Sequence, residues 1–191
     1  MSSEIKADLI KDKSGTKTLA TLSSSTVTLH SDVVFPTGHT IQTLGAIKTD
    51  TSLMNTTAAI AGLAVDITPK KTGSKMLIYC TICFARQNAN SAYPFQIFRD
   101  TTQIATPASP QGNQQTGFDT GHAGRSGDYS TFASFHHLDT HGISAGTQIS
   151  YTIKMVQRDT NATTINKSYN DGNHSYTNRG VSSLTIMEIA P

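Results

Sequence analysis

Three histidines lie close together in the sequence and are the first candidates for metal chemistry: His136, His137 and His141. Successive residues of a strand point to opposite faces, so His136 and His137 cannot bind one ion without a bulge. His137 and His141 could approach each other across a turn. The His-x-His spacing that puts two rings on one strand face is absent. The sequence therefore predicts no metal, and places these histidines as polar strand residues at a subunit interface.

Cys80 and Cys83 form a Cys-x-x-Cys pattern inside an apolar run. In redox proteins this pattern stands at the start of a helix, and a zinc site needs a second pair of ligands. If residues 76–84 form a strand, the two side chains point to opposite faces and cannot be joined without a bend. We expect two buried free thiols.

No catalytic motif is present. The sequence lacks G-x-S-x-G, the P-loop and H-E-x-x-H. Asp119, Asp128 and Asp139 stand singly, and each is expected in a turn, where Asp caps the local backbone. The interpretation is a protein that is not an enzyme and needs no cofactor.

Two long polar segments, Gln111–Asp128 and Asp159–Gly180, remain as places for binding. Amide, acidic and aromatic side chains on a rigid scaffold suit hydroxyl-rich ligands, because hydrogen bonds fix the sugar and an aromatic face packs on it. Loops of β proteins are polar in any case, which is the alternative explanation. The candidate receptor contacts are Gln115, His122, Arg125, Asp128, Tyr169, Asn173 and His174.

The composition favours β structure. Ser and Thr make up about a quarter of the 191 residues, and only 15% are charged. The branched Cβ of Thr suits a pleated sheet. A net charge of +2 and scattered basic residues argue against a nucleic-acid partner. No apolar run is long enough for membrane insertion, and the N-terminus has no apolar signal core.

Alternation of apolar and polar residues predicts about eight strands after residue 40, one short strand before it, and no amphipathic helix. Ala61-Gly62 is expected to separate two of these strands, and Asp100-Thr101 to turn a hairpin. The clearest alternation puts Ile149, Tyr151, Ile153 and Met155 inward. The predicted fold is all-β, an antiparallel β-sandwich of jelly-roll type. The expected strands are 24–30, 55–60, 63–68, 75–84, 95–99, 103–106, 129–138, 148–157 and 181–190.

Residues 1–40 differ from the rest of the chain. They are rich in Ser and Thr, and the stretch from Glu4 to Ile10 could be a short helix or an extended segment. Ordering a residue costs on the order of 1–2 kcal/mol, which so few apolar side chains cannot offset. We expect residues 1–40 to be an arm that is stabilised by other copies and by other proteins of a particle, with Ile5, Leu9 and Ile10 as anchoring residues. Residues 41–191 are the expected head.

Three stretches resemble short fibre proteins of tailed bacteriophages, including those of marine phages. These are Ser14-Gly15-Thr16 followed by a Thr-Val-Thr-Leu strand, the segment FPTGHTIQTLGAIKTDT from Phe35, and the ending SLTIMEIA from Ser183. DITPKKTGSKMLIYCTICF, from Asp66, is similar to a turn and strand of the same family. The resemblance implies a homotrimer at the surface of the virion, anchored by its arm. The arm is shorter than is usual in the family, which leaves tail fibre, tail-tip protein and head fibre open.

The function expected from the sequence is therefore a structural virion component whose head contacts a host-surface glycan or an outer-membrane component. One alternative is a capsid decoration or head-fibre protein with an architectural role and no receptor. The sequence thus leaves the location on the virion, tail or capsid, open. A third interpretation is a free carbohydrate-binding module, which would be a monomer.

Overall fold

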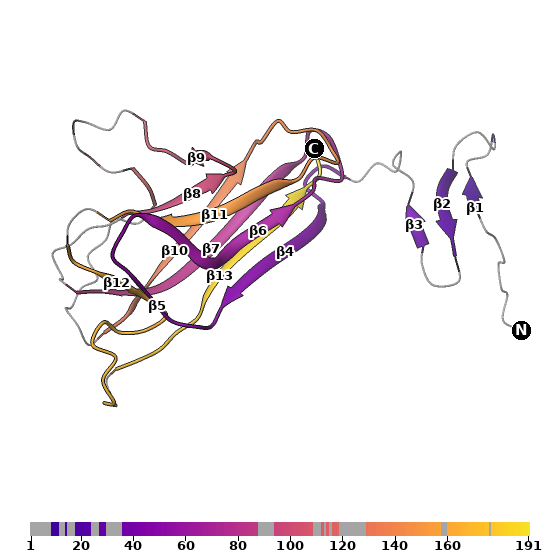
Figure 1. Cartoon of the computed structure of the whole chain (residues 1–191). Coiled ribbons are helices and arrows are strands. Elements are labelled where there is room, and N and C mark those ends of the chain that lie inside the picture. Colours follow the sequence, from indigo (N-terminus) through magenta and orange to yellow (C-terminus); the bar gives the residue numbers. More distant parts are fainter. Residues whose placement is uncertain are drawn as a thin grey trace, which may run out of the picture. The chain divides into compact units, whose positions relative to one another are not determined.

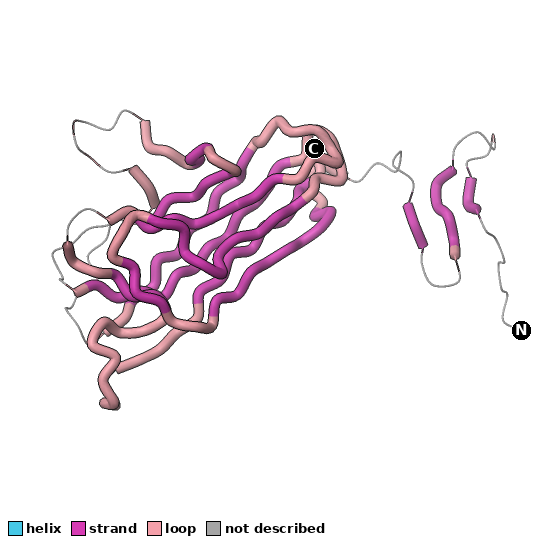
Figure 2. The backbone as a smooth tube through the Cα atoms, in the orientation of Figure 1, coloured by secondary structure: helices cyan, strands magenta, loops and turns pink. Residues whose placement is uncertain are grey.

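In the computed structural model the chain forms two compact units, Met1–Pro36 and Thr37–Pro191. The structure describes residues 9–11, 14, 18–23, 27–29, 36–87, 94–108, 112, 114, 116–118, 129–157, 160–175 and 177–191. These residues form strands, turns and loops, and none of them is helical (Figure 2). No bilayer-spanning helix therefore occurs among them. The boundary at Pro36 assigns residues 37–40 to the second unit, whereas the sequence placed them with the arm.

The first unit contains a small antiparallel sheet in the order β1-β2-β3, made of Leu9–Lys11, Thr18–Leu22 and Val27–Leu29. Leu9 and Ile10 are thus extended, and the alternative of a helix is wrong for them. Of the side chains described in this unit, only that of Ala20 is buried. Leu9 and Ile10, two of the predicted anchoring residues, are each 47% exposed. Ile5, the third, lies outside the described residues.

The second unit is a sandwich of two antiparallel sheets (Figure 1). The larger sheet has the order β4-β13-β7-β12-β5, and β10 pairs with the other edge of β7. β12 and β13 follow one another along a single edge of β7, because β13 pairs with residues 75–81 and β12 with residues 84–86. The strands of this sheet are β4 Thr40–Lys48, β5 Ser52–Met54, β7 Lys75–Arg86, β10 Thr131–Asp139, β12 Thr163–Ile165 and β13 Ser182–Ile189.

The smaller sheet has the order β6-β11-β8-β9. Along β11 every second residue is buried, as the alternation predicted for Ile149, Tyr151, Ile153 and Met155. The predicted hairpin around Asp100-Thr101 is also confirmed, because β8 pairs with β9. The core lies between the two sheets, and the all-β antiparallel sandwich is confirmed. The strands of this sheet are β6 Ala58–Ile67, β8 Phe95–Arg99, β9 Thr102–Ile104 and β11 Ile149–Met155.

Ala61-Gly62 does not separate two strands, so that prediction is wrong. β6 runs through it, and its register with β11 shifts between Thr152 and Lys154. Gly62 has a φ of 84°, a left-handed conformation that glycine adopts without a steric penalty. The glycine therefore forms a bulge and not a turn, and the strand continues on both sides of it.

The prediction of an isolated turn acid at Asp139 is also wrong. Asp139 is the last residue of β10 and is buried. It accepts hydrogen bonds from Arg99 Nη1 at 2.7 and 2.9 Å and from the Tyr151 hydroxyl at 2.7 Å. Burial, and then the hydrogen bond to Asp139, raise the pKa of Tyr151. Since Arg99 and Tyr151 belong to the smaller sheet, this group links the two sheets through the core. Asp119 and Asp128 lie outside the described residues.

Cys80 and Cys83 are free and buried, as predicted. Burial raises the pKa of the Cys80 thiol to about 12, so this thiol stays protonated and unreactive. Cys83 is on the other face of β7. A Cβ placed on Gly180 would lie 2.5 Å from the Cys83 sulfur. Residue 180 must therefore be glycine for the chain to cross Cys83 this closely.

Asn166 connects four segments of the larger sheet. Its side-chain amide donates to the carbonyls of Lys48 and Asp50 at 2.7 and 2.9 Å, and its side-chain oxygen accepts from Ser182 Oγ at 2.6 Å. Its backbone N–H donates to the Cys83 carbonyl at 2.8 Å. Asn166 is fully buried and has a φ of 63°. It therefore fills the gap between β12 and β13 on the edge of β7.

We expect Asn166→Gly to lower the free energy of unfolding by about 3 kcal/mol, since glycine keeps the left-handed backbone but leaves buried partners of the amide unsatisfied. Urea denaturation of the full chain measures this. The control is Asn55→Gly at an exposed position, for which we expect less than about 1 kcal/mol. Equal losses for the two variants would contradict the central role of Asn166.

Candidate functional site

A hairpin-like projection, residues 166–180, carries the candidate site, and we call it the finger. Its base is closed by three backbone contacts. The Gly180 N–H donates to the Asn166 carbonyl at 3.1 Å, Ser168 N–H donates to the Asn178 carbonyl at 3.0 Å, and Lys167 and Arg179 form an antiparallel bridge. Asn178 Oδ1 also accepts from Ser130 Oγ at 2.8 Å. The finger is therefore tied to the sandwich at its base.

The finger lies at one end of the sandwich, and the chain enters the sandwich at the other end. β13 begins at Ser182, directly after the finger, and ends beside Thr40, which opens β4. At that far end Ala190 N–H donates to the His39 carbonyl at 2.8 Å. A strand of this length spans about 25 Å, which separates the two ends. Figure 1 shows the finger, in gold, projecting beyond the strands at the end away from the C-terminus.

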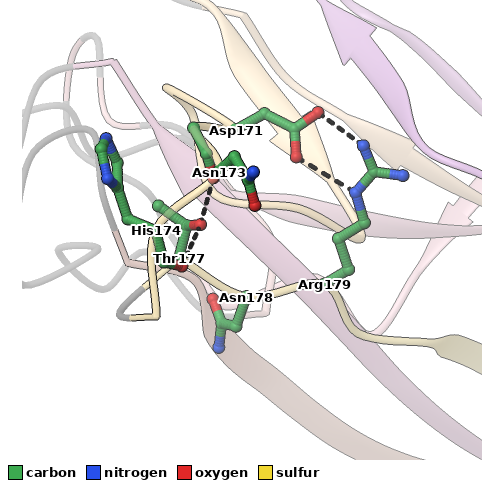
Figure 3. Close-up of a pocket in the computed structure, with 7 residues that line it drawn as sticks. Asp171, Asn173, His174, Thr177, Asn178 and Arg179 are labelled. Atoms are coloured by element: carbon green, nitrogen blue, oxygen red, sulfur yellow. Dashed lines mark hydrogen bonds and ion pairs between the residues drawn. The ribbon is translucent and has the colours of Figure 1, made fainter.

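The finger contains a polar pocket of about 320 Å³. Figure 3 shows the ion pair of Asp171 with Arg179 on one side of the pocket and His174 on the other. Five of the seven lining residues have polar or charged side chains that can exchange hydrogen bonds with a ligand, a sixth is an imidazole, and the last is a glycine. The lining residues are Asp171, Gly172, Asn173, His174, Thr177, Asn178 and Arg179.

Asp171 is held by two cations. Arg179 Nε and Nη2 lie 3.1 and 2.9 Å from its two oxygens, and Lys167 Nζ lies 3.3 Å from one of them. The hydrogen bond from Arg179 is the main reason why the pKa of Asp171 lies below its ordinary value of 3.8. A carboxylate occupied in this way is a poor general base. The arrangement fixes the shape of the pocket and leaves it suited to binding.

The other wall is held by contacts between the Thr177 side chain and backbone carbonyls. Thr177 Oγ1 donates to the carbonyls of Gly172 and His174. A Cβ on Gly172 would lie 2.8 Å from Cδ2 of His174, so the glycine leaves room for that ring. Asn173 and His174 are exposed. Their amide and imidazole groups can donate to and accept from the hydroxyls of a sugar, a use that needs no metal.

The structure brings two of the predicted receptor contacts into one pocket. Asn173 and His174 both line it, and Tyr169 lies on the same finger but not in the lining. Gln115, His122, Arg125 and Asp128 lie outside the described residues. Whether any of these residues binds a receptor stays a prediction.

The site residues predicted from the sequence did not include Thr177, Asn178 or Arg179. A signal was available in the spacing of acidic and basic residues, because Asp171 is followed by Arg179 eight residues later and preceded by Lys167 four residues earlier. One acidic residue between two basic residues of the same polar segment suggests a closed hairpin. No group of three His, Cys, Asp or Glu side chains in the described parts of the chain is placed to hold a metal.

No protein-family profile matches this chain, and no curated protein sequence is significantly similar to it. Among solved structures, the chain is similar to a structure of infectious bursal disease virus, strain Gt, with a TM-score of 0.41 and 12% identity over 88% of this chain. It is also similar to the D431N mutant VP2 protein of the same virus, with a TM-score of 0.40 and 12% identity over 89% of this chain. The match covers 42% and 40% of those chains, respectively. Similarities of this size assign neither a family nor a function.

We expect Arg179→Gln to raise the pKa of Asp171 toward 3.8, because the main stabilising partner of the carboxylate is lost. Carboxyl NMR of the full chain during an acid titration measures this. A pKa that is lowered in the folded state favours folding above the unfolded value, and that contribution disappears as the pH falls through the folded value. Lys11→Gln, in the first unit, is the control. An unchanged Asp171 titration in Arg179→Gln would contradict the described ion pair.

Proposed function

We propose that this chain is a structural protein of a virus particle, and specifically a short homotrimeric fibre of a tailed bacteriophage. The observation that supports this most is the arrangement of the second unit. The chain enters it at one end, beside His39 and Ala190, and the finger with its pocket lies at the other. The finger therefore lies at the end of the second unit that is remote from the connection to residues before Pro36.

The character of the first unit supports an anchoring role. It is a small three-stranded sheet, and the side chains of Leu9 and Ile10 in it are about half exposed. Exposed apolar side chains on a small sheet favour association with another surface. Other proteins of the particle, and the arms of further copies, are the partners that we propose for it.

The pocket supports recognition of a hydroxyl-rich ligand such as a glycan of the host surface. Its walls offer amide, hydroxyl, imidazole and guanidinium groups without a large apolar surface. Single contacts of this kind are weak. Three heads on each of many fibres gain avidity because they bind one surface together.

Deletion of residues 1–36 should leave a folded head that no longer joins particles, since the core lies entirely in the second unit. Circular dichroism of the truncated protein and its recovery with purified particles measure the two effects. The intact chain, added in the same way, is the control. A truncated protein that still joins particles would show that the anchor lies elsewhere.

His174→Ala combined with Asn173→Ala should slow adsorption of particles to the host by roughly tenfold or more. Each lost hydrogen bond weakens a head by about 1 kcal/mol, and several heads bind together. His39→Ala, at the opposite end, is the matched control. Particles that lack the protein altogether give the contrary outcome. If they adsorb to the host normally but are more fragile, the protein is a capsid decoration protein and not a receptor-binding fibre.

A further inference from the structure

β10 differs from every other edge strand of the sandwich. Among the described strands it pairs only with β7, through nine residues in uninterrupted register. The other edges are short or irregular. β5 and β9 have three residues each, and β4 and β6 have register shifts in their pairing. Short strands and bulges are the usual means by which proteins prevent edge-to-edge pairing. β10 has neither, and its sequence TFASFHHLD contains no Lys, Arg or Pro.

The outer face of the larger sheet beside β10 carries three exposed apolar side chains, and its residues next to them are uncharged. Phe132 and Leu138 on β10 are 56% and 47% exposed, and Tyr79 on β7 is 47% exposed. The rows of paired residues that cross this face contain no Asp, Glu, Lys or Arg. These rows are Leu138, Leu77, Met187 and Thr43, then His136, Tyr79, Thr185 and Gly45, and then Ser134, Thr81, Ser183 and Ile47.

We infer that β10 pairs with β10 of a second copy of this chain, antiparallel about a two-fold axis at Phe135. This register uses all nine residues. It places Phe132 opposite Leu138 of the other copy and Ser134 opposite His136. Directly opposed side chains in an antiparallel pair have Cβ atoms about 5 Å apart. Apolar therefore meets apolar, a hydroxyl meets an imidazole, and no like charges meet.

Moving the two-fold axis by one residue along β10 destroys this match. Centred on His136, the strand would bring His136 against its own copy and leave Phe132 without an opposite residue in the strand. Centred on Ser134, it would set Phe132 against His136 and leave Leu138 unpaired. The sequence of β10 is thus self-complementary about Phe135, which is the argument for a second copy as the occupant of this edge and not an unrelated protein.

The inference goes beyond the proposed function and does not rest on it. Arms that join three copies and heads that join two give six copies in the smallest closed assembly, as two fibres paired through their heads. Head pairing alone gives two copies, and arms alone give three. The number of copies in solution therefore separates the two proposals.

The experiment uses the full chain and measures its mass in solution by light scattering and sedimentation. Leu138→Lys places a charge against the apolar Phe132 of the other copy, so we expect the number of copies to halve, from six to three or from two to one. The matched control is Leu53→Lys on β5, which is 59% exposed and outside the paired edge. It should keep the wild-type mass. Thermal unfolding checks that both variants are folded.

A second variant keeps the test independent of the effect of a new charge. The double variant Ser134→Cys with His136→Cys should form two disulfides between copies on mild oxidation. In the proposed register the new thiol at position 134 of one copy lies opposite the new thiol at position 136 of the other. Each single variant should give little cross-linking, and the native thiols are buried. An unchanged mass in Leu138→Lys together with no cross-link in the double variant overturns the inference. Three copies in both wild type and Leu138→Lys would also overturn it, and would leave the trimeric fibre standing.

Discussion

The larger sheet depends on one buried amide. β12 and β13 share an edge of β7, and a gap between them would leave the carbonyl of Cys83 and those of Lys48 and Asp50 without partners. Asn166 serves all three and also accepts from Ser182. A buried polar group left unpaired costs about 1–3 kcal/mol, so one residue removes several such penalties together through its backbone and its side chain. The left-handed backbone that this requires is one that Asn tolerates better than most residues.

At the opposite end of β13 a buried carboxylate, that of Glu188, likewise satisfies several polar groups of neighbouring segments. Glu188 is fully buried, accepts from the N–H groups of Lys70 and Lys71 at 2.9 and 3.0 Å, and accepts from Gln42 Nε2 at 2.6 Å. The last strand is therefore held at both ends by polar side chains that reach into neighbouring turns. This matters for the site, because a strand fixed at both ends keeps the finger and the point of chain entry about 25 Å apart.

Alternation was enough to predict the sandwich where one face of a strand is buried and the other exposed, as in β11. It failed where both faces are covered. Residues 163–166 read as part of a polar loop, but Thr163, Thr164, Ile165 and Asn166 are all buried and form β12 and its end. The prediction for Asp139 was wrong for a related reason, because its partners Arg99 and Tyr151 come from distant parts of the sequence. Local pattern carries no information on polar groups that are satisfied at long range. The pocket was predicted only as far as Asn173 and His174, since its other wall depends on how the hairpin closes.

The two units differ in the apolar burial that stabilises each of them, and this difference affects how each one folds. The sandwich encloses a continuous apolar core between its sheets, so its stability comes from its own chain. In the first unit the described side chains bury only Ala20. A small three-stranded sheet is marginal in water unless further apolar surface covers it. The head can therefore fold as a single chain. For the first unit we propose that contacts between molecules supply further burial, so that its order rises with protein concentration or with docking.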